Sequence, residues 1–352
     1  MRYLASMLAI GLMSWGALVA RADSGPPIPT GPSPLTVISE DPGLAHRPHI
    51  DLPGGITKLP AVTYSVLNGF RPLTLDIFAP KVTATLHPIV IYIHGGGWSL
   101  DPNGDEGLSG DSGMAELAGR GYVVVRPTYR LTSEAIFPAQ LIDVKTAVRW
   151  AKTYAAAYGG DPSRVVVWGA SAGGNLSALV GTSCGQSQFD TVAPLGRFYG
   201  LSTPAIDPKV TSCVVAAIDW FGPTDFAAMA SEALPGADKH NTASAPESQY
   251  LGCVIPQCPA DKLAAADPIT YVSKDSPPLL IMHGLADPAV PHQQSEDLYK
   301  ALRAKGVPAE LVLVPGASHM FMGVPPKIMR AQLDTVFRWI DRRTRAKSGP
   351  AP

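Results

Sequence analysis

The sequence predicts an α/β fold in which helices cover both faces of a doubly wound, mostly parallel sheet. Short, nearly continuous apolar runs recur along the chain, and strands of this kind are buried on both faces, as in a parallel sheet. Helical periodicity fills the intervals between them, so strand and helix alternate over most of residues 89–340. Such alternation implies right-handed crossover connections. Composition agrees, because 46% of the 352 residues are hydrophobic and 16% are charged, which excludes disorder for most of the chain.

The strands fall into two groups. Residues 62–66 and 73–78 alternate apolar and polar side chains around Asn68-Gly69, a turn signal typical of an antiparallel hairpin. The parallel strands are expected at residues 89–93, 123–125, 165–168, 214–218, 279–282 and 311–314. The helices are expected at residues 139–158, 172–182, 293–305 and 328–343.

Residues 1–22 are typical of an export signal. Arg2 precedes an apolar stretch over residues 4–20, which ends in a small-x-small cleavage pattern, Ala20-Arg21-Ala22. A membrane anchor is the alternative, but the stretch is short and interrupted by polar residues. We therefore expect cleavage, export to the periplasm or the medium, and no stable membrane anchor.

The rest of the chain divides into a leader and one domain. Residues 23–60 are rich in Pro and Gly and predict an extended leader. Residues 61–345 form the expected domain, and residues 221–275 break its alternation of strand and helix. We interpret this interval as an insertion over the carboxyl edge of the sheet, where such folds bind ligands. A formal charge of −1 offers no electrostatic footprint for nucleic acid.

The four cysteines suit an oxidising compartment. Four cysteines allow three pairings, which sequence alone does not separate. We favour Cys253–Cys258, which would close a small loop, together with Cys184–Cys213. Buried free thiols are the alternative. A zinc site is disfavoured because no CxxC pair or nearby cluster of histidines is present.

The most informative motif is G-x-S-x-G, Gly169-Ala170-Ser171-Ala172-Gly173. It follows an apolar strand and opens a helix of small residues. A nucleophile elbow needs this setting, because its strained turn leaves no room for Cβ atoms beside the serine. A Gly/Ser turn that caps a helix is the alternative. The setting favours Ser171 as a nucleophile.

A glycine run, His94-Gly95-Gly96-Gly97-Trp98, follows the strand expected at residues 89–93. Acyl transfer creates an oxyanion, and backbone N–H groups must already point at it. Glycines let the chain approach the substrate closely, and we expect donors at Gly95, Gly96 and Ala172. A phosphate loop would continue into Lys-Ser/Thr, which is absent here. His94 is expected to shape this loop rather than act as a base.

A serine nucleophile needs a base, and the base needs an orienting carboxylate. His319 follows the last strand and Asp287 follows the preceding one, which gives the chain order Ser, Asp, His. Ser171, His319 and Asp287 are therefore the predicted catalytic triad. His283 lies directly at a strand end and is assigned a role in the turn. The rivals are His292 as base and Asp219 or Asp225 as acid.

These motifs together resemble a known family. H-G-G-G-W, G-x-S-A-G-G, the Gly284/Asp287 loop and a late G-x-S-H are similar to those of α/β-hydrolase esterases and lipases related to hormone-sensitive lipase. The similarity is closest to the smaller bacterial branch that includes feruloyl-esterase-like and arylformamidase-like enzymes, and it covers residues 62–343. It implies an α/β-hydrolase fold, small-molecule carboxylic ester substrates, a Ser171 acyl-enzyme and no cofactor. The insertion around Cys253–Cys258 departs from the family and leaves the shape of the acyl pocket open.

Four aromatic residues adjoin the predicted catalytic loops and are candidates for lining the substrate pocket: Trp98, Trp220, Phe221 and Phe321. Core packing is the alternative for each of them. Trp98 is the strongest candidate because it follows the glycine run directly.

Two other functions compete with hydrolysis of small or aromatic esters. An amide hydrolase, either an arylformamidase or a serine peptidase of the prolyl-oligopeptidase type, would use the same motifs, although the chain holds no propeller-sized domain for such a peptidase. A non-catalytic binding protein on the same fold is the other, and the intact predicted triad argues against it. The ester and the oligomeric state do not follow from the sequence.

Overall fold

The computed structural model describes residues 48–81, 85–101, 110–190, 197–198, 201–202 and 205–345. The expected signal segment and residues 23–47 of the expected leader lie outside these ranges. No helix within them is both long and apolar enough to cross a membrane.

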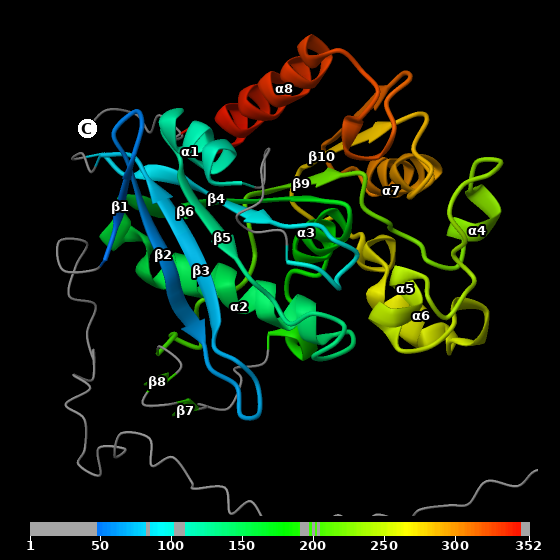
Figure 1. Ribbon diagram of the computed structural model, residues 1–352, viewed down its shortest axis with the longest axis horizontal. Helices are drawn as coiled ribbons and strands as arrows, with labels where there is room; N and C mark the ends of the chain where they lie inside the picture. The colour runs from blue at the N-terminus through cyan, green and yellow to red at the C-terminus, as the bar shows by residue number, and fades with distance from the viewer. Residues whose placement is uncertain are drawn as a thin grey trace, which may run out of the picture. The chain divides into compact units, whose positions relative to one another are not determined.

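A mixed sheet organises the described residues (Figure 1). Its strands run in the order β1-β2-β3-β5-β4-β6-β9-β10-β11. The strands from β5 to β11 are parallel to one another, whereas β1, β2 and β3 pair antiparallel. Their bounds are β1 Ile50–Leu52, β2 Ile56–Ser65, β3 Leu73–Ala79, β4 His87–Ile93, β5 Val123–Pro127, β6 Gly160–Ala170, β9 Ala216–Trp220, β10 Leu279–Gly284 and β11 Ala309–Val314. The expected hairpin and parallel sheet are confirmed.

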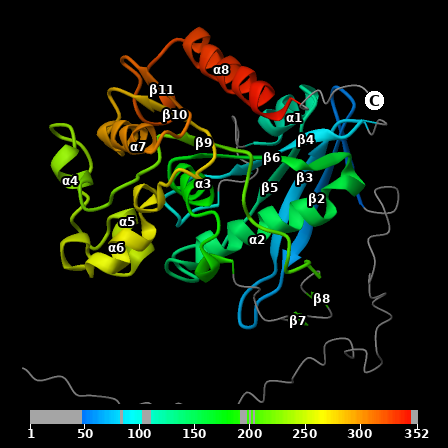
Figure 2. The same ribbon diagram turned by 180° about the vertical axis from the view of Figure 1, so that it is seen from behind.

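Helices cover both faces of this sheet, as Figure 2 shows from behind. They are α1 Asp111–Gly119, α2 Ala139–Tyr154, α3 Ala172–Thr182, α4 Met229–Glu232, α5 Pro246–Leu251, α6 Ala260–Ala266, α7 Gln293–Ala304 and α8 Pro326–Thr344. Two short strands, β7 Arg197–Phe198 and β8 Leu201–Ser202, pair apart from the main sheet.

Consecutive side chains of the central strands point to opposite faces of the sheet and therefore contact different helices. On β4, Ile89 and Ile91 belong to the core cluster that contains α2, α3 and α7. Val90 and Tyr92 point the opposite way, into the cluster formed with α1 and α8. Side chains alternate across a strand, so a strand with helices on both faces must be apolar at consecutive positions. This explains the continuous apolar runs of the sequence.

Several boundaries differ from those expected. Residues 50–60, assigned to the leader, form β1 and the first half of β2, so the domain begins before residue 61. Helix α1 was not expected, because its nine residues include two glycines and only a short apolar stripe. Helix α2 ends at Tyr154 and continues as a 3₁₀ turn over Ala155–Tyr158.

The segment between β9 and β10 contains α4, α5 and α6. It leaves the sheet after Trp220, at the carboxyl end of β9, and returns at Leu279 on the neighbouring strand β10. Figure 1 shows these three helices grouped beyond the carboxyl ends of the central strands.

Two disulfides join the four cysteines in the pairing that the sequence favours. Cys184 and Cys213 connect the end of α3 to the segment before β9. Cys253 and Cys258 close a short loop after α5.

Candidate active site

Ser171 lies in the sharp turn between β6 and α3. Its backbone has φ 58° and ψ −123°, a conformation that residues with a side chain rarely adopt. The N–H of Ser171 donates to the carbonyl of Trp220 at 2.8 Å, which anchors the turn to β9. The turn therefore lifts the serine hydroxyl above the carboxyl edge of the sheet.

Glycines make this turn sterically possible. A Cβ on Gly169 would lie 1.9 Å from the carbonyl oxygen of Gly173, and a Cβ on Gly173 would lie 2.1 Å from the carbonyl oxygen of Ile93. Neither separation is compatible with a methyl group, so β6, α3 and β4 can approach this closely only with glycine at both positions.

Ser171, His319 and Asp287 form one hydrogen-bonded line. The Nε2 of His319 lies 3.0 Å from the Oγ of Ser171, and its Nδ1 lies 2.7 Å from the Oδ2 of Asp287. The three residues come from the ends of β6, β10 and β11, as their order in the sequence predicts. If Nδ1 carries the proton, the free Nε2 faces the serine hydroxyl in the position of a general base.

The carboxylate of Asp287 is fully buried and well supplied with donors. The N–H groups of Ala289 and Val290 donate to its Oδ1 at 2.8 and 2.9 Å. Burial by itself raises the pKa of Asp287, but hydrogen bonds from His283, His319 and Val290 outweigh it, so the pKa lies well below its usual range. The group is therefore an anion beside His319.

His283 supports that anion from the opposite side. Its Nε2–H donates to the carbonyl of Val290 at 2.9 Å and lies 3.3 Å from the Oδ2 of Asp287. Its Nδ1 accepts from the hydroxyl of Ser295 at 2.6 Å. The sequence assigned His283 a role in the turn, and the contact with Asp287 adds to that role.

The two loops that carry Asp287 and His319 are joined directly. The N–H of Ala286 donates to the carbonyl of Ala317 at 2.9 Å. A Cβ on Gly284 would lie 2.3 Å from the same carbonyl oxygen, so glycine is required for this approach. The ring of Phe221 packs edge-on against His319 at 4.9 Å between centroids, which limits how the imidazole can turn.

The glycine run after β4 lies beside the elbow. A Cβ on Gly95 would lie 2.8 Å from the carbonyl oxygen of Ala170, so Gly95 fits tightly against the elbow. Gly97 borders the cavity beside Ser171. His94 is buried and stacks on Tyr129 at 4.2 Å between centroids, and its Nδ1–H donates to the carbonyl of Gly95 at 2.8 Å. Burial lowers the pKa of His94. His94 therefore shapes the loop.

The rival residues make other contacts. His292 pairs through Nδ1 with Glu296 at 2.9 Å. The carboxylate of Asp225 accepts from the N–H of Ala228 at 3.2 Å. Asp219 lies buried behind the elbow, where its Oδ1 accepts from the N–H of Gly222 at 2.8 Å, and burial raises its pKa to about 7. The Nδ1 of His319 contacts Asp287 instead of either rival acid.

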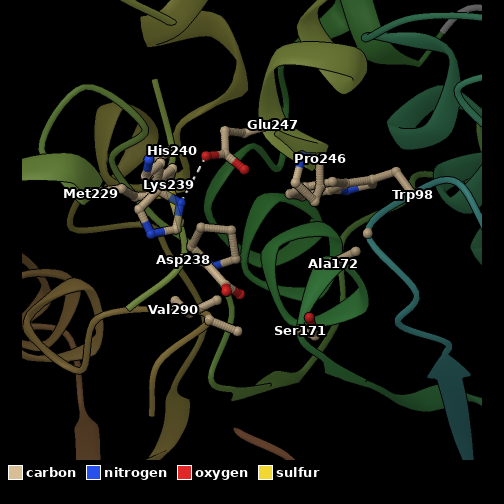
Figure 3. Close-up of a pocket in the computed structure, with 13 residues that line it drawn as sticks. Trp98, Ser171, Ala172, Met229, Asp238, Lys239, His240, Pro246, Glu247 and Val290 are labelled. Atoms are coloured by element: carbon tan, nitrogen blue, oxygen red, sulfur yellow. Dashed lines mark hydrogen bonds and ion pairs between the residues drawn. The ribbon is translucent and has the colours of Figure 1, made fainter. Parts of the chain in front are cut away.

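A cavity of about 160 Å³ opens beside Ser171 (Figure 3). Trp98 and Ala172 border it together with side chains of the segment between β9 and β10. These side chains include Met229, Asp238, Lys239, His240, Pro246 and Glu247. The sequence marked this segment as a cover for the sheet edge but singled out none of these residues. The only feature of the sequence that pointed to these residues is the break in strand–helix alternation over residues 221–275, because no motif distinguishes them.

Three of the four aromatic candidates do not line this cavity. Trp220, Phe221 and Phe321 belong to the core cluster on the α8 side of the sheet and are at most 3% exposed. Trp220 lies two residues after Ile218 on β9, so the pleat turns both side chains to that face. Only Trp98 of the four borders the cavity.

Comparison with known proteins shows the family of the chain and its similarity to named esterases. Residues 75–302 match the family model BD-FAE. The chain belongs to the BD-FAE family. The sequence-based resemblance to α/β-hydrolase esterases is thereby confirmed.

The curated relatives of this BD-FAE family member include two esterases of Mycobacterium tuberculosis. Esterase LipC is 30% identical over 263 residues, which cover 73% of this chain and 59% of LipC. Esterase LipQ is 30% identical over 293 residues, which cover 79% of this chain and 61% of LipQ. The chain therefore spans about three fifths of the length of these relatives.

Solved structures of esterases share the fold of this BD-FAE family member. A truncated carbohydrate esterase from gut microbiota has a TM-score of 0.65 and 31% identity, and the match covers 82% of this chain and 96% of that one. The thermophilic esterase Est2 of Thermogutta terrifontis has a TM-score of 0.60 and 23% identity, with coverage of 84% and 96%. The α/β-hydrolase fold expected from the sequence is confirmed.

Proposed function

We propose that this chain is a serine carboxylesterase in which Ser171 attacks the ester carbonyl. The hydrogen-bonded line from Asp287 through His319 to Ser171, at the wall of a cavity, carries the proposal. The family and the named esterases among its relatives support the same reaction class.

The proposed reaction has two halves. In the first, Nε2 of His319 takes the proton of Ser171 while Oγ bonds to the carbonyl carbon. The same proton then passes to the alcohol as the ester bond breaks, which leaves an acyl-enzyme. In the second, water gives its proton to His319 and attacks the acyl group, and the proton returns to Ser171 as the acid leaves. Asp287 holds His319 and stabilises its positive charge in both halves.

The oxyanion of each half is assigned to backbone N–H groups. Ala172 begins α3, so its N–H has no partner within the helix, and it borders the cavity beside Ser171. Residues 95–97 would supply the remaining donors. Gly97 borders the cavity, so it joins the donors Gly95 and Gly96 that the sequence suggests.

The cavity indicates small substrates. A volume of about 160 Å³ is close to that of an engineered protein cavity of about 150 Å³ that holds one benzene molecule. A short acyl chain or a single aromatic ring fits within such a space, whereas a long fatty acyl chain would extend beyond it. The proposed substrates are therefore esters of small or aromatic acids.

Export is also proposed. Two disulfides are compatible with folding in an oxidising compartment, and the sequence of residues 1–22 is typical of a cleaved signal. Fractionation of cells that express the full chain, followed by N-terminal sequencing of the exported protein, tests this expectation at Asp23.

A panel of p-nitrophenyl esters from acetate to dodecanoate, together with feruloyl and acetylated-sugar esters, tests the proposed function. Turnover should be highest for short or aromatic acyl groups and should be absent from Ser171→Ala. An N-formyl aryl amide and an aminoacyl amide test the alternative amide hydrolase in the same assay. If a fluorophosphonate probe failed to label the wild-type protein and no ester was cleaved, a non-catalytic binding protein would be the better description.

A further inference from the structure

The cavity beside Ser171 contains a buried carboxylate that the proposed reaction does not use. Glu247 lies in the first turn of α5 and is 3% exposed, and it borders the same cavity as Ser171. Burying a charged carboxylate is unfavourable unless hydrogen bonds replace the lost water. The hydrogen-bond partners of this carboxylate therefore indicate which chemical groups the cavity can bind.

One oxygen of Glu247 has a partner within the protein. Its Oε1 accepts from the Nδ1–H of His240 at 2.8 Å, and His240 is 4% exposed. This bond ties the segment before α5 to the helix and fixes the orientation of the carboxylate. Figure 3 shows the pair at the edge of the cavity, with the bond drawn as a dashed line.

The second oxygen has no such partner. Among the described residues, no donor lies within hydrogen-bond distance of Oε2, although the side chain is more than nine-tenths buried. In Figure 3 this oxygen points away from His240, toward the centre of the view. A carboxylate oxygen at a cavity wall, on a residue with this little exposure, is suited to accept hydrogen bonds from a molecule in the cavity.

The other charged side chains at the cavity lie at its rim. Asp238 and Lys239 also border the cavity, and both are exposed at its rim. Their charges oppose each other, and His240 already donates to Glu247. A hydroxyl group would donate to Oε2 without bringing a charge, and comparison with a cationic ester distinguishes this bond from charge pairing with Glu247.

We propose that Glu247, oriented by His240, is a specificity-determining residue that accepts a hydrogen bond from a hydroxyl group of the ester substrate. The inference rests on the proposed esterase function and narrows its substrates to hydroxylated esters, such as those of polyols and sugars. Trp98 borders the same cavity and offers an apolar surface to the carbon skeleton of such a substrate.

Glu247→Gln is the matched variant for this proposal. The amide oxygen of Gln can still accept the bond from His240, while the amide nitrogen replaces the free oxygen and donates instead of accepting. The substitution keeps shape and the link to His240 but removes the acceptor from the cavity. Glu232→Gln is the control, because Glu232 lies in the same segment, binds Gln294 at 2.7 Å and does not border the cavity.

Two pairs of esters that differ in hydroxyl groups provide the readout. Glycerol monoacetate is compared with propyl acetate, and methyl 3-hydroxybutyrate with methyl butyrate, which place the hydroxyl on the alcohol and the acyl side. The wild type should prefer the hydroxylated ester of one pair in kcat/KM. Glu247→Gln should reduce that preference by about 10- to 100-fold, the range expected for a hydrogen bond to a charged group, mainly through KM. Glu232→Gln should retain it.

The outcomes separate this inference from the function on which it rests. Hydrolysis of p-nitrophenyl acetate by the wild type reports on the esterase function alone, and its absence with every ester would overturn both proposals. If that ester is hydrolysed but Glu247→Gln slows both members of each pair equally, or leaves their ratio unchanged, Glu247 has only a structural role. Preference for a cationic ester over its hydroxylated counterpart would also overturn the inference.

Discussion

Ser171 has a strained backbone. Its φ of 58° combines with a ψ of −123°, and such conformations raise the free energy of the folded state by about 1–3 kcal/mol at a residue with a side chain. Other non-glycine residues with positive φ surround the site. Among the described residues they are Trp98, Phe221, Met320 and Phe321, with Ala61 on β2 as the exception. Positive φ at residues with a side chain is thus concentrated in the loops that carry or adjoin Ser171 and His319.

Comparison of Ser171→Gly with Ser171→Ala measures this strain. Glycine adopts the conformation freely, although it also gains about 0.5–1 kcal/mol of entropy in the unfolded chain. Ser171→Gly should therefore be more stable than Ser171→Ala by about 1 kcal/mol in urea unfolding. Both variants should lack esterase activity. Equal or greater stability of Ser171→Ala would show that the turn is not strained.

The depressed pKa of Asp287 predicts a pH dependence of stability. Burial opposes ionisation, but the bonds from His283, His319 and Val290 outweigh it. Because the folded pKa lies below the unfolded value of about 3.9, the stabilisation is complete above that pH and is lost as the pH falls through the folded pKa. The difference in Tm between wild type and Asp287→Asn should therefore be constant near neutral pH and should narrow below about pH 4.

Thermal unfolding from pH 7 to pH 3 checks this expectation. Asp275→Asn is the control, because Asp275 pairs with Lys274 at the surface, with 78% of its side chain exposed, and such pairs contribute little to stability. A Tm difference for Asp287→Asn that widens toward acid pH would contradict the assignment. In activity, Asp287→Asn should reduce kcat by about 10⁴-fold, as loss of the orienting carboxylate does in a serine protease triad.

At the scale of elements, the elbow depends on how closely β6 and α3 approach. Gly169→Ala would place a methyl group 1.9 Å from a backbone oxygen of α3, so the helix must shift. Such overpacking typically reduces the free energy of unfolding by about 1–3 kcal/mol. Esterase activity should fall as well, since the displaced helix carries the N–H of Ala172. Urea unfolding and p-nitrophenyl acetate turnover measure the two effects.

Gly119→Ala is the matched control. Gly119 is the exposed last residue of α1, and a Cβ there would meet no atom within 4 Å. Replacement of a glycine in a compatible conformation typically stabilises by about 0.4–1 kcal/mol. If Gly169→Ala were tolerated as well as Gly119→Ala, the close packing of β6 on α3 would not be needed for the elbow.

The elements that the sequence predicts well are those with a strong local pattern. The apolar runs predicted the parallel strands, and the long amphipathic stripes predicted α2, α7 and α8. Helix α1 has too few apolar positions for such a stripe. The sequence suggests Ser171, His319 and Asp287 as a triad because each follows a strand in a recognisable motif, and in the structure the three side chains are hydrogen-bonded in one line.

Contacts between distant segments leave no local pattern in the sequence. Trp220 and Phe321 adjoin the predicted catalytic loops in sequence, but the pleat and the loop geometry turn them into the core on the α8 side. Glu247 and His240 come together only because the segment between β9 and β10 folds back over the sheet edge. No periodicity or motif encodes that return, so the sequence does not predict the residues of the cavity wall.

At the scale of the whole molecule, the two disulfides should differ in their contribution to stability. In the chain-entropy description a disulfide stabilises by restricting the unfolded chain, more so for a longer loop. The sequence separations are 29 for Cys184–Cys213 and 5 for Cys253–Cys258. The expected contributions are about 3.6 and about 2 kcal/mol. The Cys184–Cys213 disulfide should therefore contribute more to the free energy of unfolding than Cys253–Cys258 does.

Paired serine variants test this difference. The Cys184→Ser/Cys213→Ser protein should unfold at lower urea than the Cys253→Ser/Cys258→Ser protein, and a reducing agent should bring the wild type below both. A larger loss of stability from the short loop would show that local packing, rather than loop length, determines the contribution. Non-reducing mass analysis that found four free thiols in the wild type would remove the basis of the comparison.

The segment between β9 and β10 has a consequence for how members of this fold diversify. It leaves and re-enters the sheet at adjacent strands, so its length and sequence can change while the strands on either side keep their positions. The proposed nucleophile, base and acid all lie outside its helices, whereas Glu247 and His240 lie within it. A change in this segment would therefore alter the wall of the cavity and leave the proposed triad in place, and the same two junctions are suitable places to graft a foreign segment.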